Sequence, residues 1–245
     1  MTSATAAQRY ADLTRDHQER ARLADPAPRP PADQLLDPAT GTIAIGRYAD
    51  GTVALARLWN TDGAAHCQIA AETGAGSSTL IDHLLAAEHA SDLTRSWAAR
   101  GYGIRDGLTE RTATTRGETL DLLRDAASLM HERLADPHDA SGPYVPTPER
   151  PLISITLGHG SYSAAGSSQA ARLVIEIATA GRPAGLALRV EGKGSLPCSI
   201  PLPQTVDHAQ VIVLGSRSMP GRGLTVENRT VSGGPTFRTW APTEQ

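Results

Sequence analysis

The sequence predicts an α/β fold in which a mainly parallel sheet is flanked by helices and preceded by a short N-terminal β-hairpin. Two patterns indicate this: short apolar runs typical of buried strands alternate with helical periods, and a Gly/Ser turn joins one strand to the next helix. The chain has 245 residues, enough for one such domain, with 40% hydrophobic and 20% charged residues.

Residues 1–38 are expected to form a flexible N-terminal arm and a proline-rich linker. Apolar residues are sparse in the first part, and four prolines at positions 26–31 exclude a helix there. The folded domain is therefore expected to begin near Thr40 and to cover residues 40–240.

The first strands and the first helix follow in order. Thr42–Ile45 and Thr52–Leu55 favour strands, and the Asp50-Gly51 dipeptide between them suits the turn of a hairpin. A buried strand is then expected at His66–Ala70 and a helix at Ser78–His89.

Five more elements complete the prediction. Thr115 and Glu118 form a T-x-x-E capping box, which marks the start of a second helix. The expected inward residues of this helix are Leu120, Leu123, Ala127, Met130 and Leu134. The elements that follow are a strand at Leu152–Leu157, a helix at Ser168–Ala180 with Ala171, Val174, Ile175 and Ala178 inward, and strands at Gly185–Val190 and Gln210–Leu214.

The turn before the first helix partly matches the phosphate-binding motif G-x-x-x-x-G-K-[ST]. In that motif the lysine reaches the phosphates and the hydroxyl holds Mg²⁺. Within residues 71–78, Ala71 replaces the first glycine and Ser77 replaces the lysine, whereas Gly76 and Ser78 are kept. A plain Gly/Ser turn before a helix remains an alternative interpretation.

The wider sequence resembles the FtsK/SpoIIIE family of P-loop DNA translocases, especially transfer proteins of conjugative plasmids and integrative elements. Four segments between about residues 40 and 215 carry the resemblance: HCQIAAETGAGSSTLIDHLLAAE from His66, GETLDLLRDAASLMHERL from Gly117, PTPERPLISITLGHG from Pro146 and AARLVIEIATAGRPAGLALRV from Ala170. The resemblance implies a RecA-like P-loop NTPase fold with a degenerate phosphate loop, whose remaining cofactor-binding positions are Gly74, Gly76, Ser77, Ser78 and Thr79.

The second nucleotide-binding motif of that family is also missing. Where active members carry an aspartate for Mg²⁺ and a glutamate that activates water, this chain has Gly158 and His159. Lys193 is the only lysine in the chain, and we expect it near the carboxyl end of its strand; to replace the loop lysine it would have to fold back across the sheet. We therefore expect no catalytic residue, no metal site and no bound cofactor.

The resemblance implies a catalytically inactive relative of these motors, which acts by binding or assembly, including a role in DNA transfer of a mobile element. Its expected partner is a second copy or an FtsK-like motor, and the net charge of −3 gives no support for DNA binding. Alternatives are a weak ATP- or phosphate-binding sensor and an unrelated enzyme that reuses Ser77, Ser78 and His159.

The remaining composition indicates a cytoplasmic protein. No apolar run approaches the ~20 residues of a membrane span, and no signal peptide is recognisable. Cys67 and Cys198 fit neither a zinc nor a redox spacing, so we expect buried thiols. Apart from His66 and His159, the histidines, including His83, His89, His131 and His138, are expected on helix surfaces.

Overall fold

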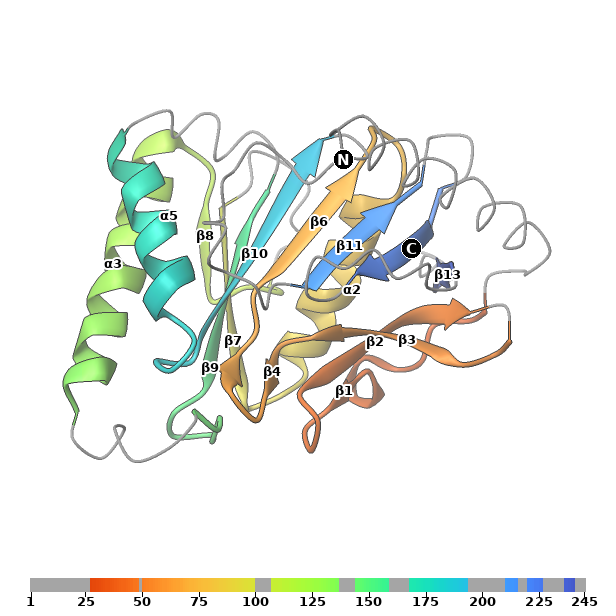
Figure 1. The fold of residues 1–245 in the computed structure, drawn as a ribbon, viewed down its shortest axis with the longest axis horizontal. Helices are drawn as coiled ribbons and strands as arrows, with labels where there is room; N and C mark the ends of the chain where they lie inside the picture. The colour runs from red at the N-terminus through yellow and green to blue at the C-terminus, as the bar shows by residue number, and fades with distance from the viewer. Residues whose placement is uncertain are drawn as a thin grey trace, which may run out of the picture.

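The structure is a computed structural model that describes residues 27–48, 50–99, 107–136, 144–158, 168–193, 210–215, 220–226 and 236–240. Its main sheet contains eleven strands in the order β1-β2-β13-β12-β11-β6-β10-β9-β7-β8, with β3 paired to β2 (Figure 1). These strands are β1 (Leu36–Asp37), β2 (Thr42–Tyr48), β3 (Val53–Arg57), β6 (Cys67–Ala71), β7 (Thr94–Ala99), β8 (Arg111–Ala113), β9 (Leu152–Leu157), β10 (Leu186–Lys193), β11 (Gln210–Leu214), β12 (Arg222–Val226) and β13 (Phe237–Thr239). A separate pair is formed by β4 (Trp59–Asn60) and β5 (Gly63–Ala64).

The sheet has a parallel half and an antiparallel half. Six neighbouring strands, from β11 through β6, β10, β9 and β7 to β8, run parallel. The strands from β12 to β1 and β3 pair antiparallel. The predicted mainly parallel sheet and the N-terminal β2–β3 hairpin are thus confirmed, whereas β1, β7, β8, β12 and β13 were not predicted.

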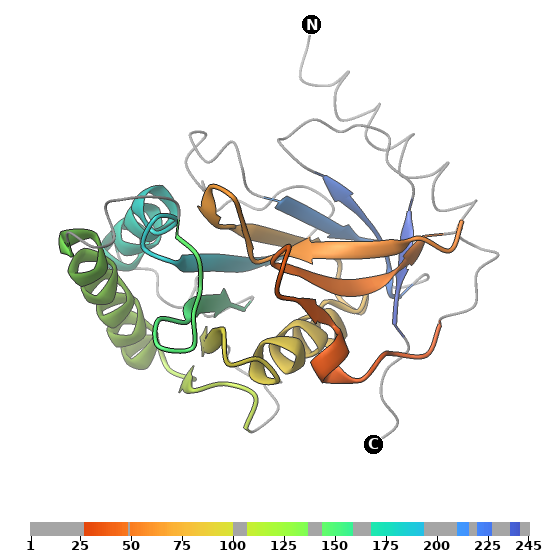
Figure 2. The ribbon, with the colours of Figure 1, turned by 90° about the horizontal axis from the view of Figure 1, so that it is seen from below.

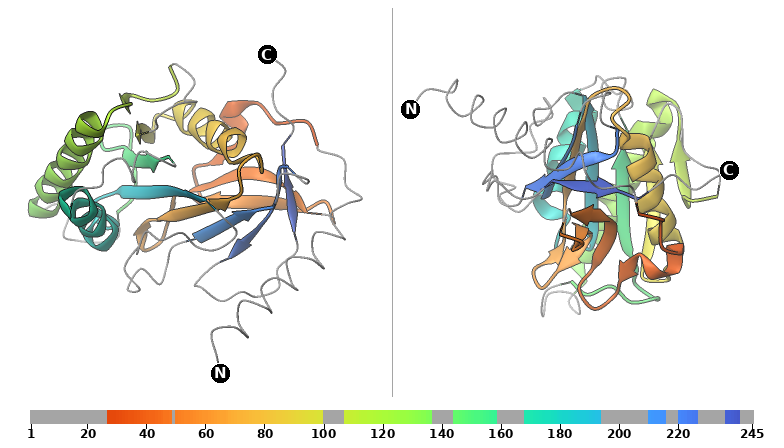
Figure 3. Two further views of the ribbon diagram at one scale, coloured as in Figure 1. Left: turned by 90° about the horizontal axis from the view of Figure 1, so that it is seen from above. Right: turned by 90° about the vertical axis from the view of Figure 1, so that its right-hand side faces the viewer.

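Helices cover both faces of the parallel half, as expected for a sheet buried on both sides. Helix α2 (Ser77–His89) lies on one face, and α3 (Arg116–Ala135) and α5 (Ser168–Ala180) lie side by side on the other (Figures 1 and 2). The two views of Figure 3 show the same layers, with the β2–β3 hairpin at the end of the sheet away from α3 and α5. Each face has its own hydrophobic core.

The buried stripes of α3 and α5 are rotated slightly from the predicted ones. In α3 the buried apolar residues are Leu122, Leu123, Ala126, Ala127 and Met130, whereas the predicted Leu134 is 43% exposed. In α5 the buried positions are Ala170, Val174, Ile177 and Ala178, whereas Ile175 is 39% exposed. The predictions for Leu134 and Ile175 were therefore wrong, because each helix packs against its neighbour as well as against the sheet.

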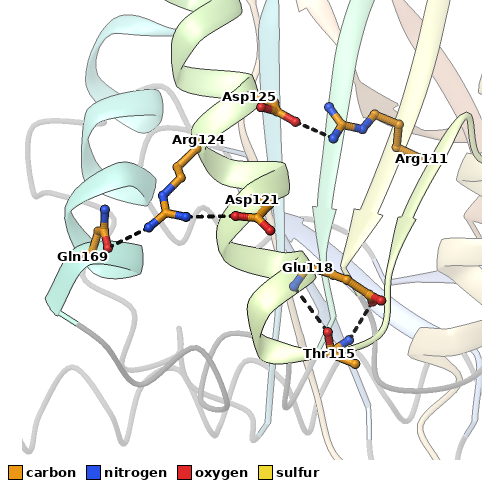
Figure 4. Close-up of polar contacts among 7 residues, drawn as sticks. All are labelled: Arg111, Thr115, Glu118, Asp121, Arg124, Asp125 and Gln169. Atoms are coloured by element: carbon orange, nitrogen blue, oxygen red, sulfur yellow. Dashed lines mark hydrogen bonds and ion pairs between the residues drawn. The ribbon is translucent and has the colours of Figure 1, made fainter.

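The capping box of α3 is present as predicted (Figure 4). The Glu118 N–H donates to Thr115 Oγ1 (3.2 Å), and the Thr115 N–H donates to the Glu118 carboxylate (3.0 Å). Hydrogen bonds from the Thr114 N–H and the Thr115 N–H to its carboxylate lower the pKa of Glu118 below its ordinary value. A cap of this kind stabilises a helix by about 1 kcal/mol, and here it fixes the point where the chain turns from β8 into α3.

Buried residues occur before the expected start of the folded domain. Leu35 and Leu36 are 2% and 9% exposed within the α2-side core, and β1 pairs with β2. Apolar contacts of these leucines with the core order the end of the proline-rich segment. The fold thus begins earlier than Thr40, while the flexible arm at residues 1–26 stays a prediction outside the described residues.

The outer edge of β3 is closed by a side chain of β11. The Arg57 N–H donates to Gln210 Oε1, and the Gln210 Nε2–H donates to Leu55 O; each donor–acceptor distance is 3.0 Å. One amide thus satisfies two backbone groups that a neighbouring strand would otherwise pair. The sheet curls so that the predicted hairpin meets β11 as well as β13.

Two buried polar groups link the strands to helices on opposite faces. Arg189 of β10 forms an ion pair with Glu88 of α2 and donates to Thr156 Oγ1 (3.0 Å), and the Ser96 hydroxyl donates to Glu88 Oε2 (2.7 Å). On the other face, His66 Nδ1 accepts from the Leu188 N–H (3.0 Å).

The His66 ring is neutral, because a protonated Nδ1 could not accept that bond. Its Nε2–H therefore donates to Ala178 O (3.0 Å) in α5. Burial lowers the pKa of His66 from 6.5 to about 4.

The neighbouring Cys67 is buried, as predicted. Burial raises the pKa of its thiol to about 11, so the thiol is unreactive. Cys198 lies outside the described residues.

No helix in the described part of the chain has both the length and the apolar character required to cross a membrane. The predicted cytoplasmic location stays a prediction.

We predict that His66 makes the fold sensitive to mild acid. The unfolded state binds a proton near pH 6.5 and the folded state only near pH 4, so the free energy of unfolding falls as pH drops through this window. The fall should be about 2 kcal/mol between pH 7 and pH 5. Chemical denaturation of the unaltered chain, of His66→Asn and of the exposed-site control His89→Gln measures it. Only His66→Asn should lose this part of the pH dependence; equal curves for all three would contradict the assignment.

Candidate functional site

The loop between β6 and α2 closes on itself through backbone hydrogen bonds. The Ala75 N–H donates to Glu72 O (3.0 Å), and the Leu80 N–H donates to Gly76 O (3.0 Å) at the start of α2. Gly74 and Gly76 have φ angles of 84° and 98°, which residues with a Cβ rarely adopt. Both glycines are therefore required by the path of the backbone itself.

The N-terminus of α2 has the backbone geometry of an anion cradle. Gly76 is its N-cap residue and supplies no side-chain cap. The first N–H groups of a helix have no partner within the helix, and the helix dipole adds positive potential there. Ser77 and Thr79 are half-buried and Ser78 is exposed. The structure therefore brings the predicted loop residues together at the carboxyl edge of the parallel strands.

The side chains of this loop oppose an anion. Residues 71–79 contain no lysine or arginine, and Ser77 stands at the lysine position of the motif. Glu72 is exposed at the start of the loop, and its carboxylate repels phosphate groups. Hence the backbone of the loop is suited to bind phosphate, whereas the negative formal charge of its side chains opposes phosphate binding.

Lys193 lies closer to the loop than we expected. It is the last residue of β10, and its backbone is in register with Ala71, the last residue of β6. The predicted position at the carboxyl end of the strand is confirmed. The strand was expected to end at Val190, whereas its pairing with β6 continues through Lys193.

The second predicted position follows β9, with β10 between it and β6. Gly158 is buried, and its N–H donates to Ala99 O of β7 (2.8 Å). Since Gly158 carries no side chain, it offers no ligand for Mg²⁺ and no base for water. His159 lies outside the described residues.

The other predicted candidates in the described part of the chain lie away from the loop. His83 is 2% exposed, so its predicted surface position was wrong, whereas His131 lies on the surface of α3 beside Glu176. No group of three or more potential metal ligands occurs among the described residues. A hollow of about 350 Å³ lies at the amino ends of β7 and β8, the opposite edge of the sheet from the loop.

One residue that contacts the loop, Gly221, was not predicted from the sequence. The Gly221 N–H donates to Ala75 O (2.9 Å), and a Cβ at Gly76 would lie 3.1 Å from Gly221 N. The Pro220-Gly221 dipeptide is a turn signal, but nothing in it indicates a partner almost 150 residues earlier. Gly221 therefore belongs to the loop site because it contacts the loop, although it is no part of the sequence motif.

Comparison with solved structures finds the same fold in ATPase domains. The cytoplasmic domain of the type VII secretion ATPase EccC of Thermomonospora curvata is 19% identical, with a TM-score of 0.64 over 88% of this chain and 28% of that one. ATPases 2 and 3 of EssC from Geobacillus thermodenitrificans are 13% identical, with a TM-score of 0.62 over 91% of this chain and 48% of that one. The pCW3 conjugation coupling protein TcpA, in its monomer form with ATPγS, is 13% identical, with a TM-score of 0.65 over 90% of this chain and 71% of that one.

These similarities show the fold: a RecA-like P-loop ATPase sheet, as predicted. The chain spans about a quarter of the EccC chain and about half of the EssC chain. No family model and no curated protein matches the sequence.

We predict that Gly76 is needed for stability without any ligand. Gly76→Ala should lower the free energy of unfolding by about 1–3 kcal/mol. A φ of 98° is unfavourable for a residue with a Cβ, and the added methyl group would also press against the backbone of Gly221. Gly117→Ala is the matched control, since nothing lies within 4 Å of its Cβ position in α3. It should be neutral or stabilising by up to about 1 kcal/mol. Equal losses in urea denaturation would refute the steric argument.

Proposed function

We propose that this chain is a non-hydrolysing relative of the FtsK/SpoIIIE-type motors that acts by binding or assembly. One observation carries the proposal: the loop keeps the backbone shape of a phosphate cradle but has Ser77 and Glu72 where binding needs positive charge. The glycine at position 158 supports it, because the strand end that serves Mg²⁺ and water in active enzymes has no side chain.

Catalysis of phosphoryl transfer depends almost entirely on positioning and electrostatic stabilisation. Removal of one such group from an active site costs about 3 kcal/mol or more in the transition state. With Ser77, Gly158 and His159 in place of lysine, aspartate and glutamate, three of these groups are replaced together. Little stabilisation of the transferring phosphoryl group is then left.

Assembly with another ATPase domain fits the similar proteins. The EssC structure contains two ATPase domains in one chain, and this chain matches about half of it. We propose that the partner is a second copy or an FtsK-like motor, in the DNA transfer of a mobile element. TcpA is a conjugation coupling protein, which supports that setting.

A second candidate function, a weak sensor of ATP or phosphate, is favoured by one observation. The backbone of Lys193 lies level with Ala71, one strand away from the loop. A lysine from β10 would restore part of the charge that Ser77 lacks. The two functions differ in the affinity that they require for nucleotide.

We predict no ATPase activity. Phosphate release from ATP-Mg²⁺ by the purified chain should equal that of a buffer blank. Ser77→Lys alone should not restore turnover, because Gly158 and His159 still supply neither a metal ligand nor a base. Release above the blank that is abolished in Ser78→Ala, with folding checked by circular dichroism, would overturn the proposal.

We predict that ATP-Mg²⁺ binds with a dissociation constant in the millimolar range or weaker. A charged hydrogen bond such as the missing lysine contact contributes ~1.5–3 kcal/mol, and its loss weakens binding roughly tenfold to over a hundredfold. In calorimetry, Ser77→Lys should strengthen binding, and Glu72→Gln should strengthen it less. A micromolar constant that weakens in Lys193→Ala would favour the sensor instead.

A further inference from the structure

The loop is connected to the C-terminal strand by two consecutive backbone hydrogen bonds. The Thr239 N–H of β13 donates to Gly221 O (2.7 Å), and the Gly221 N–H donates to Ala75 O (2.9 Å). Gly221 therefore links β13 to the loop, because its carbonyl oxygen accepts from Thr239 while its N–H donates to Ala75. Ala75 is fully buried at this contact.

The contact leaves no space for side chains. Gly221 has a φ of 74°, and a Cβ there would lie 2.5 Å from Thr239 Oγ1. A Cβ at Gly76 would lie 3.1 Å from Gly221 N and 3.5 Å from Gly221 Cα. Two backbone segments distant in sequence thus meet at glycines, so displacement of one must change the position of the other.

Strand β13 is in turn held firmly by the N-terminal hairpin. It pairs with β12 on one side and with β2 on the other. Phe237 and Trp240 are 0% and 2% exposed, and Trp240 Nε1–H donates to Ala44 O (2.9 Å). The Arg47 guanidinium lies 5.7 Å from the centre of the Trp240 ring.

We propose that β13 is a latch that holds the β6–α2 loop in its cradle conformation without a bound nucleotide. When β13 leaves the sheet, the loop loses the Gly221 contact and opens. The β2–β3 hairpin and the loop are thereby coupled across the molecule, so a partner that displaces β13 changes the loop as well. This coupling concerns the same loop as the proposed function but does not rest on it.

Hydrogen exchange of Thr239→Pro tests the latch. Proline removes the N–H that Thr239 donates to Gly221, whereas Thr239→Ala keeps the N–H and removes only the hydroxyl and the Cγ2 methyl group of the side chain. Without nucleotide, exchange of the amides of residues 72–80 and of Gly221 should rise by about tenfold or more in Thr239→Pro. Thr239→Ala should stay close to the unaltered chain. Unchanged exchange in Thr239→Pro, or an equal rise in both variants, overturns the proposal.

Native-state exchange of the unaltered chain decides the question if Thr239→Pro does not fold. As denaturant is added below the unfolding transition, the amides of β13, Gly221 and the loop should open as one cooperative unit with a shared dependence on denaturant. Opening of the loop at lower denaturant than β13 overturns the latch. Neither measurement includes ATP, so its failure is distinct from a failure of the ATPase prediction.

Discussion

The ion pair between Glu88 and Arg189 fixes the helix on which the candidate site depends. Glu88 is in the last turn of α2 and is 0% exposed, and besides Arg189 it accepts a hydrogen bond from Ser96. Its backbone oxygen accepts a further bond from the Thr94 hydroxyl (2.6 Å). Removal of one partner of a buried pair leaves an uncompensated charge, which typically costs 3–5 kcal/mol. The carboxyl end of α2 is thus tied to β7 and β10, while Gly221 holds the loop at its other end.

This double attachment gives the glycines of the loop a role in packing that requires no bound phosphate. Gly76 has a positive φ and faces the backbone of Gly221, so the packing of this chain requires glycine there with or without phosphate. Ser77, by contrast, is half-buried and Glu72 is exposed.

Local patterns predicted the elements that depend on local physics. The capping box of Thr115 and Glu118 and the strand Leu152–Leu157 were predicted at the positions observed. Strand β7 was missed because its sequence TRSWAA mixes polar and apolar residues without alternation, and Ser96 is buried only through its bond to Glu88. The loop residues were found by motif, whereas Gly221 and Arg189 act through partners more than 100 residues away. Such long-range partners have no signature in a single sequence.

The place of β13 in the sheet also has a consequence for how the chain folds during synthesis. Its partner in β2 was made long before it: Gly46 pairs with Thr239, a separation of 239 − 46 = 193 residues. Pairing over such a distance makes closure of the sheet slow, because the entropy of the long loop is lost before the contacts form. A ribosome must therefore complete nearly the whole described chain before the N-terminal hairpin can join the main sheet. Until then part of one edge of β2 is left open to pairing with other strands.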